Sequence, residues 1–322
     1  MILFTNNEPM ALDVISTLQQ KFATNVINDG RNADINRYDI LGMEIEYIRG
    51  KTMKIGMARG LEDKLPKLNI RLDPYRGVPG RPNERIIKTE CSMNEADYKR
   101  KVKWQQQVIG LASYVGYKYR FDILYYVNTL ARHTLYPSRQ VIDLAKQLIQ
   151  FLWCTRRKCL TWSKNRNDKT KLVAISDAAF ANQDGLQSQF GHMIMLNNKI
   201  IGARSSKSTI TCTSSTEAEI YALAETIPRI MNVETLVRTI DNKKTKCIVW
   251  SDSQPGMAAI NSADVSKIKS KFYGTKLLRI KEELDAGNIK MSYIKTDDNT
   301  ADILTKPLSV NKFKELTKQW MQ

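Results

Sequence analysis

Histidine and cysteine are scarce in this sequence, and their positions exclude several classes of protein. The 322 residues include only two histidines, His133 and His192, which lie far apart. The cysteines are odd in number and show no disulfide-framework spacing: Cys91, Cys154, Cys159, Cys212 and Cys247. No recognisable zinc-binding pattern results, and we expect free thiols in a reducing compartment.

Long apolar segments are also missing. No run of about 18 or more apolar residues occurs, so no transmembrane helix and no membrane partner are expected. The first residues, MILFTNNEPMALDVI, lack the basic start and the long apolar core of a secretory signal peptide. With 42% hydrophobic and 26% charged residues, the composition is typical of a globular protein. The length predicts two domains, each able to bury a core.

Acidic residues are the minority, and the positive excess is concentrated in one segment. Lys and Arg number 50 against 33 Asp and Glu, which gives a net charge of +17. Residues 99–170 hold 15 basic and 3 acidic residues, or +12 of that total. Tryptophans and tyrosines interleave with these basic residues. This combination favours a nucleic-acid partner, because the charges suit phosphates and the rings suit bases. The alternative is a solvated basic face over an aromatic core.

The first half of the chain reads as strands followed by helices. Residues 1–58 are rich in strand patterns, interrupted by the helical pattern ALDVISTLQQKFA. Residues 65–90 contain four prolines and two glycines and indicate a linker. Residues 95–157 predict two or three helices, one of them capped by Ser138. A second boundary is expected at the polar, basic residues 163–171.

The last 150 residues alternate between strands and helices. Two strands, 190–196 and 199–205, are separated by Asn197-Asn198, which predicts a hairpin. The other expected elements are strands at 171–176, 246–251 and 288–294, helices at 215–237 and 266–286, a short helix after 251, and a closing helix from about Asn299. Hairpin strands followed by strand–helix alternation predict an α/β layered sheet of mixed direction.

Two of these apolar strands end in the same way. KLVAIS runs into Asp177, and KCIVWS runs into Asp252. Functional groups gather at the carboxyl ends of strands in such sheets, so adjacent strands would bring these two aspartates face to face. Carboxylates that close repel each other unless a cation neutralises them, and Mg²⁺ prefers hard oxygen ligands. Either aspartate alone would read as a turn or cap residue, but the matched pair favours a metal site.

Further carboxylates come from two helix starts. In SSTEAEIYALAET, Glu217 and Glu219 point about 200° apart on a helix. Glu217 fits a capping box begun by Ser214. Glu219 lies near the apolar stripe and is the better candidate to face the aspartates. In DDNTADILTK, Asp302 lies in a first helical turn, where it would otherwise only complement the helix dipole.

Together these motifs resemble a known family. The series SDAAF, SSTEAEIYAL, WSDSQ and NTADILTKPL is similar to the ribonuclease H domain of Ty/copia-type LTR retrotransposon Pol polyproteins, and closest to the Ty elements of yeast. Upstream, YDILGMEIEY resembles the segment after the reverse transcriptase palm, and residues 109–138 resemble the connection region. The resemblance implies a D-E-D-D set of catalytic and metal-binding residues at Asp177, Glu219, Asp252 and Asp302.

The resemblance also implies the fold and its division. It predicts an α/β ribonuclease H-like mixed sheet flanked by helices at 169–322, after a basic helical connection region at 91–168. Residues 1–90 would be a remnant of the reverse transcriptase palm and thumb with the Pro/Gly linker. MILFTNN resembles the strand after the family's paired-aspartate polymerase motif, so that pair is expected to precede Met1. No polymerase activity is therefore expected from this chain alone.

The implied function is hydrolysis of the RNA strand of RNA–DNA hybrids with two Mg²⁺ ions, for which Mn²⁺ would substitute. Nucleic-acid contacts are expected from Arg204, Lys207, Lys276 and Arg279. Full-length Pol or virus-like particle proteins are the implied partners, and the implied locations are cytoplasmic particles and the nucleus. The alternative is a catalytically incompetent nucleic-acid-binding remnant. An integrase is less favoured, because of the fourth carboxylate and the missing His/Cys zinc module.

Overall fold

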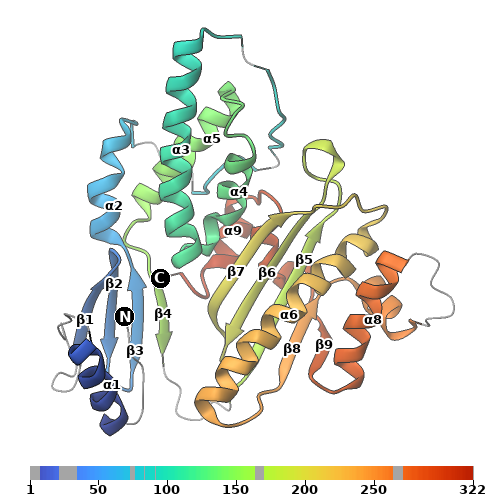
Figure 1. The fold of residues 1–322 in the computed structure, drawn as a ribbon. Coiled ribbons are helices and arrows are strands. Elements are labelled where there is room, and N and C mark those ends of the chain that lie inside the picture. Colours follow the sequence, from blue (N-terminus) through green and yellow to red (C-terminus); the bar gives the residue numbers. More distant parts are fainter. Residues whose placement is uncertain are drawn as a thin grey trace.

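The computed structural model describes residues 8–21, 35–72, 77–82, 84–90, 92–163, 170–263 and 271–321. Two β-sheets and a group of helices make up the molecule (Figure 1). One sheet has four strands in the order β1-β2-β3-β4, and the other has five in the order β7-β6-β5-β8-β9. Within these residues no helix combines the length and the apolar character that crossing a membrane requires.

The four-stranded sheet is antiparallel throughout. It consists of β1 (Ile35–Ile40), β2 (Met43–Ile48), β3 (Thr52–Gly56) and β4 (Leu160–Ser163), and helix α1 (Glu8–Lys21) precedes it. These elements confirm the strand-rich start and its helix, while the expected strand at ILF lies outside the described residues. β4 returns from the end of the helical region to pair with β3. The sheet therefore joins segments 1–90 and 91–168, whose division stays a prediction.

In sequence, four α-helices of the described residues lie between β3 and β4, and the last three of them confirm the helices predicted at 95–157. They are α2 (Ala58–Lys64), α3 (Glu95–Lys118), α4 (Leu124–Arg132) and α5 (Arg139–Cys154). Asn94 caps α3 by accepting a hydrogen bond from the Asp97 amide, and Ser138 caps α5 by accepting one from the Val141 amide. Residues 77–80 of the predicted linker are buried. This part of the linker therefore packs against the core.

The five-stranded sheet is of mixed direction and confirms the predicted α/β class. β5 (Leu172–Ala179), β6 (Gln189–Leu196) and β7 (Lys199–Lys207) are antiparallel, whereas β8 (Cys247–Ser251) and β9 (Ile289–Tyr293) run parallel to β5. The hairpin turn at Asn197 and Asn198 has φ values of 51° and 60°. Asparagine tolerates this left-handed conformation, which a two-residue hairpin turn requires.

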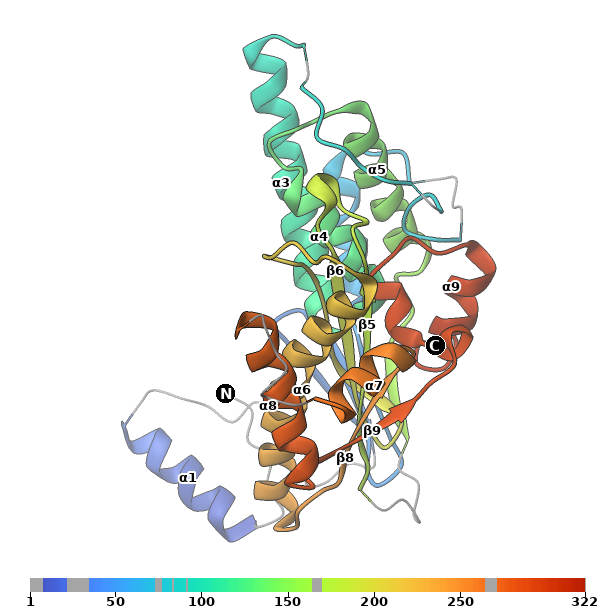
Figure 2. The same cartoon turned by 90° about the vertical axis from the view of Figure 1, so that its right-hand side faces the viewer.

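Helices flank this sheet on both faces. Helices α6 (Ser215–Asp241), α7 (Gln254–Asn261) and α8 (Lys271–Asp285) lie on one side, and the 3₁₀ helix η6 (Thr300–Leu304) and α9 (Val310–Thr317) lie on the other (Figure 2). The expected closing helix is thus two pieces: η6 after Asn299 and α9 after Ser309. Pro307 separates them, because a proline disfavours helical backbone at the residue before it.

The chain's last helix belongs to the core of the helical region. Phe313 of α9 meets Phe151 of α5 with ring centroids 5.7 Å apart. Trp320 and Met321 are buried in the same cluster, and Met321 forms a β-bridge with Leu160. This packing fixes the five-stranded sheet against α4 and α5.

Candidate active site

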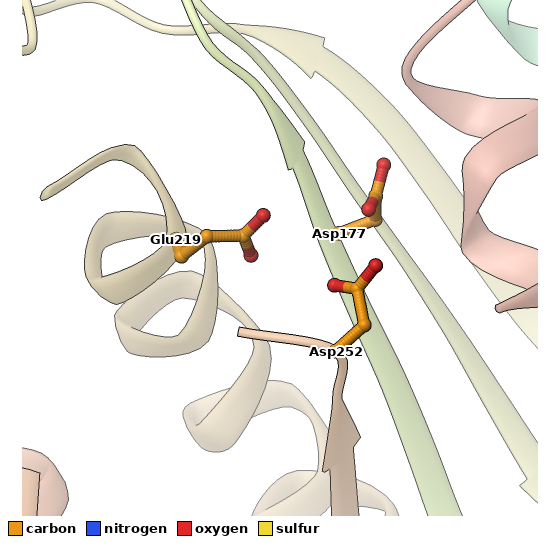
Figure 3. Close-up of side chains that lie close together, drawn as sticks. All are labelled: Asp177, Glu219 and Asp252. Carbon is orange, nitrogen blue, oxygen red and sulfur yellow. The ribbon is translucent and has the colours of Figure 1, made fainter. Parts of the chain in front are cut away.

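Three carboxylates meet at the carboxyl ends of β5 and β8. Asp177 lies in β5, Asp252 directly follows β8, and Glu219 lies in the second turn of α6. Ile175 pairs with Trp250 in the parallel ladder, so the two aspartates stand at the same level of the sheet. One carboxylate oxygen from each of the three residues lies within 4.8 Å of the other two (Figure 3). This confirms the predicted convergence of the two strand ends.

The first two glutamates of α6, Glu217 and Glu219, have different surroundings. Glu217 accepts hydrogen bonds from the backbone amide and hydroxyl of Thr213 and from the hydroxyl of Tyr221, as a capping residue does. Glu219 faces the aspartates, and its Oε1 accepts a hydrogen bond from the Ala178 amide at 3.3 Å. The other oxygen, Oε2, is buried without a hydrogen-bond partner. A buried, unbonded carboxylate oxygen fits a metal ligand better than a structural residue.

Asp302 lies in η6, beyond the group of three. Its Oδ1 forms an ion pair with Lys306 Nζ at 2.8 Å, one helical turn later in sequence. Asp302 is buried, and its charge adds to the larger effect of burial in raising the pKa of Asp177. The structure therefore places the fourth predicted carboxylate beside the others but gives it a lysine partner.

Two residues next to η6 orient Asp177, and sequence reasoning did not assign them this role. Asn299 donates its Nδ2 to Asp177 Oδ1 at 3.0 Å while its own Oδ1 caps η6. The Thr305 hydroxyl donates to Asp177 Oδ2. Both oxygens of Asp177 are thus held by the segment that carries Asp302. For Asp302, its i, i+4 spacing from Lys306 is a local signal that could have revealed the lysine partner. The partners of Asp177 lie more than 120 residues away from it in sequence and leave no such signal.

Burial and mutual repulsion disfavour the charged form of these carboxylates. Burial, with a smaller effect of the Asp302 charge, raises the pKa of Asp177 to about 7. Burial and then the charges of Asp177 and Asp252 raise the pKa of Glu219 well above its usual value. Burial also raises the pKa of Asp302, although Lys306 opposes the shift. A divalent cation would reverse these shifts, and hard oxygen donors suit such a cation.

The four predicted nucleic-acid contacts lie on two separate elements. Arg204 and Lys207 belong to the edge strand β7, where Lys207 ends the strand. Lys276 and Arg279 are exposed on α8, and Arg279 pairs with Glu283 of its own helix at 2.8 Å. The structure does not bring the four together, and their role stays a prediction. His192 is buried in β6, where burial lowers its pKa to about 3, in keeping with an ordinary strand residue.

Comparison with known proteins identifies relatives over the whole chain. No protein-family model matches it. The Ty1-NL2 and truncated Ty1-A transposon Gag-Pol polyproteins of Saccharomyces cerevisiae are each 46% identical to it over 100% of its length. The chain covers 19% and 27% of these two relatives, so it spans about a fifth to a quarter of their length.

Two solved structures show partial similarity. The foamy viral protease-reverse transcriptase in complex with an RNA/DNA hybrid is 12% identical, with a TM-score of 0.46. This match covers 91% of the present chain and 34% of the viral one. The N-terminal RNase H domain of Rv2228c from Mycobacterium tuberculosis is 13% identical, with a TM-score of 0.33. It covers 47% of the present chain and 98% of its own.

Proposed function

We propose that this chain is a ribonuclease H that hydrolyses the RNA strand of RNA–DNA hybrids, on the basis of its 46% identity to the Ty1 Gag-Pol polyproteins over its whole length. The observation that supports this most directly is the convergence of Asp177, Glu219 and Asp252 at the ends of two parallel strands. The basic segment 99–170 would contact the phosphates of the hybrid, since +12 of the net charge lies there.

Two Mg²⁺ ions, or Mn²⁺ in their place, would be held by Asp177, Glu219, Asp252 and Asp302. When bound, such ions would activate the attacking water and stabilise the charge at the scissile phosphate. The unbonded Oε2 of Glu219 and the exclusively oxygen donor set fit this chemistry.

The protein's own side chains prepare the site. Asn299 and Thr305 fix both oxygens of Asp177, which holds that carboxylate in one orientation. The Ala178 amide holds Oε1 of Glu219, and Oε2 has no hydrogen-bond partner among the described residues. Lys306 pairs with Asp302 and opposes the effect of burial, which raises the pKa of this fourth carboxylate.

Cleavage of a labelled RNA–DNA hybrid tests the proposal. We expect cleavage with Mg²⁺ and none with chelator, and no cleavage of single-stranded RNA or duplex DNA. Asp177→Asn should abolish cleavage while hybrid binding in chelator is retained. Tight, salt-sensitive binding by the unaltered protein without cleavage would instead indicate a nucleic-acid-binding remnant. Unchanged cleavage by Asp177→Asn would refute the site assignment.

A further inference from the structure

Arg132, the last residue of α4, is a half-buried arginine, and within the described part of the chain its hydrogen bonds go to neutral groups. Its Nη2 donates to Thr129 Oγ1 at 3.1 Å and to Gln183 Oε1 at 2.6 Å, and its Nη1 donates to Gln189 Oε1 at 3.1 Å. Burial lowers the pKa of Arg132. No carboxylate among these partners offsets the partial desolvation of the guanidinium, so its hydrogen bonds to neutral side chains are what hold it in place.

One chain of hydrogen bonds runs from Arg132 through the five-stranded sheet. Gln189, at the start of β6, accepts from Arg132 with its Oε1 and donates its Nε2 to Ser205 Oγ at 2.7 Å. The Ser205 hydroxyl then donates to the Leu304 carbonyl at 2.6 Å. Gln189 and Ser205 are both buried. This chain therefore connects α4 to the last residue of η6.

A second chain runs from Arg132 along the loop after β5. Gln183 accepts from Arg132 with its Oε1 and donates its Nε2 to Asn182 Oδ1 at 2.9 Å. Asn182 then donates its Nδ2 to the Thr305 carbonyl at 2.9 Å. The two chains thus end on consecutive carbonyls of the backbone, those of Leu304 and Thr305.

Both chains begin at Arg132, and this residue sets the direction in which their hydrogen bonds are donated. A guanidinium only donates hydrogen bonds, so both glutamine oxygens must turn toward Arg132. Each glutamine amide nitrogen then faces onward and can only donate to the next group. Removing Arg132 removes the group that fixes these orientations, and buried chains of this kind depend on every member.

The end of these chains is tightly packed and contacts the carboxylate site. A Cβ atom added at Gly191 of β6 would lie 2.7 Å from Leu304 Cβ and 2.8 Å from Thr305 Cγ2. The backbone at Leu304 and Thr305 therefore rests directly on the strand. The side-chain hydroxyl of Thr305 donates to Asp177, and η6 carries Asp302.

We propose that Arg132 is a positioning residue for the carboxylate site: through the two chains it fixes the Leu304 and Thr305 carbonyls and thereby the orientation of Asp177 and Asp302. The helical region would thus set the geometry of the site as well as bind nucleic acid. This inference rests on the proposed ribonuclease H function for its kinetic readout but not for its other readouts.

The test compares Arg132→Met, Arg132→Lys and the control Arg59→Met in the full chain. Arg59 is an exposed arginine of α2, so its replacement removes the same charge away from both chains. For Arg132→Met we expect kcat to fall about 10- to 100-fold, as on loss of an outer-shell partner, with KM for the hybrid unchanged within about twofold. Arg132→Lys should recover part of this loss, because an ammonium can still donate.

Two readouts do not require catalysis. Mn²⁺ affinity, measured by electron paramagnetic resonance, should fall about 10-fold in Arg132→Met. Amide hydrogen exchange of a peptide covering residues 300–306 should accelerate, while peptides from α8 should exchange as before. If the unaltered protein does not cleave hybrid, the proposed function fails, and these two readouts still decide the role of Arg132.

Partial removal of the chains provides a second route should Arg132→Met not fold. Asn182→Ala and Gln189→Ala each interrupt one chain, and each should reduce kcat and Mn²⁺ affinity. In Arg132→Met these changes should add little, because the chains are already interrupted. A raised KM with unchanged kcat, Mn²⁺ affinity and exchange would overturn the proposal and make Arg132 a phosphate contact. Unchanged values throughout would also overturn it.

Discussion

The contact between β6 and the backbone after η6 leads to a quantitative prediction at Gly191. In Gly191→Ala the new methyl group would start 2.7 Å from Leu304 Cβ and 2.8 Å from Thr305 Cγ2. Ordinary contact between two carbons requires about 3.5–4.0 Å, so the backbone at Leu304 and Thr305 must move by roughly 1 Å. Overpacking of this kind costs about 1–3 kcal/mol of unfolding free energy.

The same displacement should affect catalysis more than stability. Thr305 donates its hydroxyl to Asp177, and a misplacement of about 1 Å in such a site can reduce the rate about 100-fold. We therefore expect Gly191→Ala to unfold at lower urea concentration and to cleave hybrid about 100-fold more slowly, with hybrid binding in chelator unchanged.

Gly202→Ala is the matched control for this substitution. Gly202 lies in β7 of the same hairpin, and a Cβ added there would meet no atom within 4 Å. This variant should equal the unaltered protein in urea midpoint and in rate, or be slightly more stable. If Gly191→Ala behaved like Gly202→Ala in both assays, the close packing at Leu304 and Thr305 would be refuted.

Three further predictions concern charged groups. Lys306→Met should lower the unfolding free energy in chelator by about 1–2 kcal/mol, as measured by urea melts. This loss is smaller than for a fully buried pair, because the lysine side chain is 38% exposed. Mg²⁺ should reduce the loss. The pKa of Asp177 is about 7 in the folded protein and about 4 in the unfolded chain. Without metal, proton binding by Asp177 therefore stabilises the fold fully below about pH 4, and this contribution is lost as the pH rises to about 7. Asp177→Asn should therefore flatten the change in urea midpoint between about pH 4 and pH 7. Arg120→Met should cost about 3–5 kcal/mol in the same melts, because it leaves the buried Asp122 carboxylate without its partner, whereas Arg37→Met on the surface should cost less than about 1 kcal/mol.

The site residues could be predicted from the sequence where a local pattern and the expected sheet topology pointed to the same residue. Asp177 and Asp252 were found because each follows an apolar strand, and Glu219 was separated from Glu217 by the helix face it occupies. Arg132 was not found, because its partners Gln183 and Gln189 lie 51 and 57 residues away. No local periodicity encodes such contacts, which depend on how α4 packs against the sheet.

The same limit applies to parts of the fold. The four residues of β4 were not predicted as a strand, since pairing with the distant β3 makes them one. The closing helix was predicted as one element because the Asn299 cap signals only a start. Pro307 and the Ser309 cap, which divide it into η6 and α9, were the local signals left unused.

The packing of α9 determines where this chain can be divided. Phe313, Leu316 and Trp320 lie in a core that also contains residues of α3, α4 and α5. A protein trimmed to residues 169–322 would therefore present these three side chains to solvent as one apolar patch and would lose Arg132 as well. Such a fragment should self-associate, and a soluble ribonuclease H domain taken from this chain would have to retain the helices that cover α9.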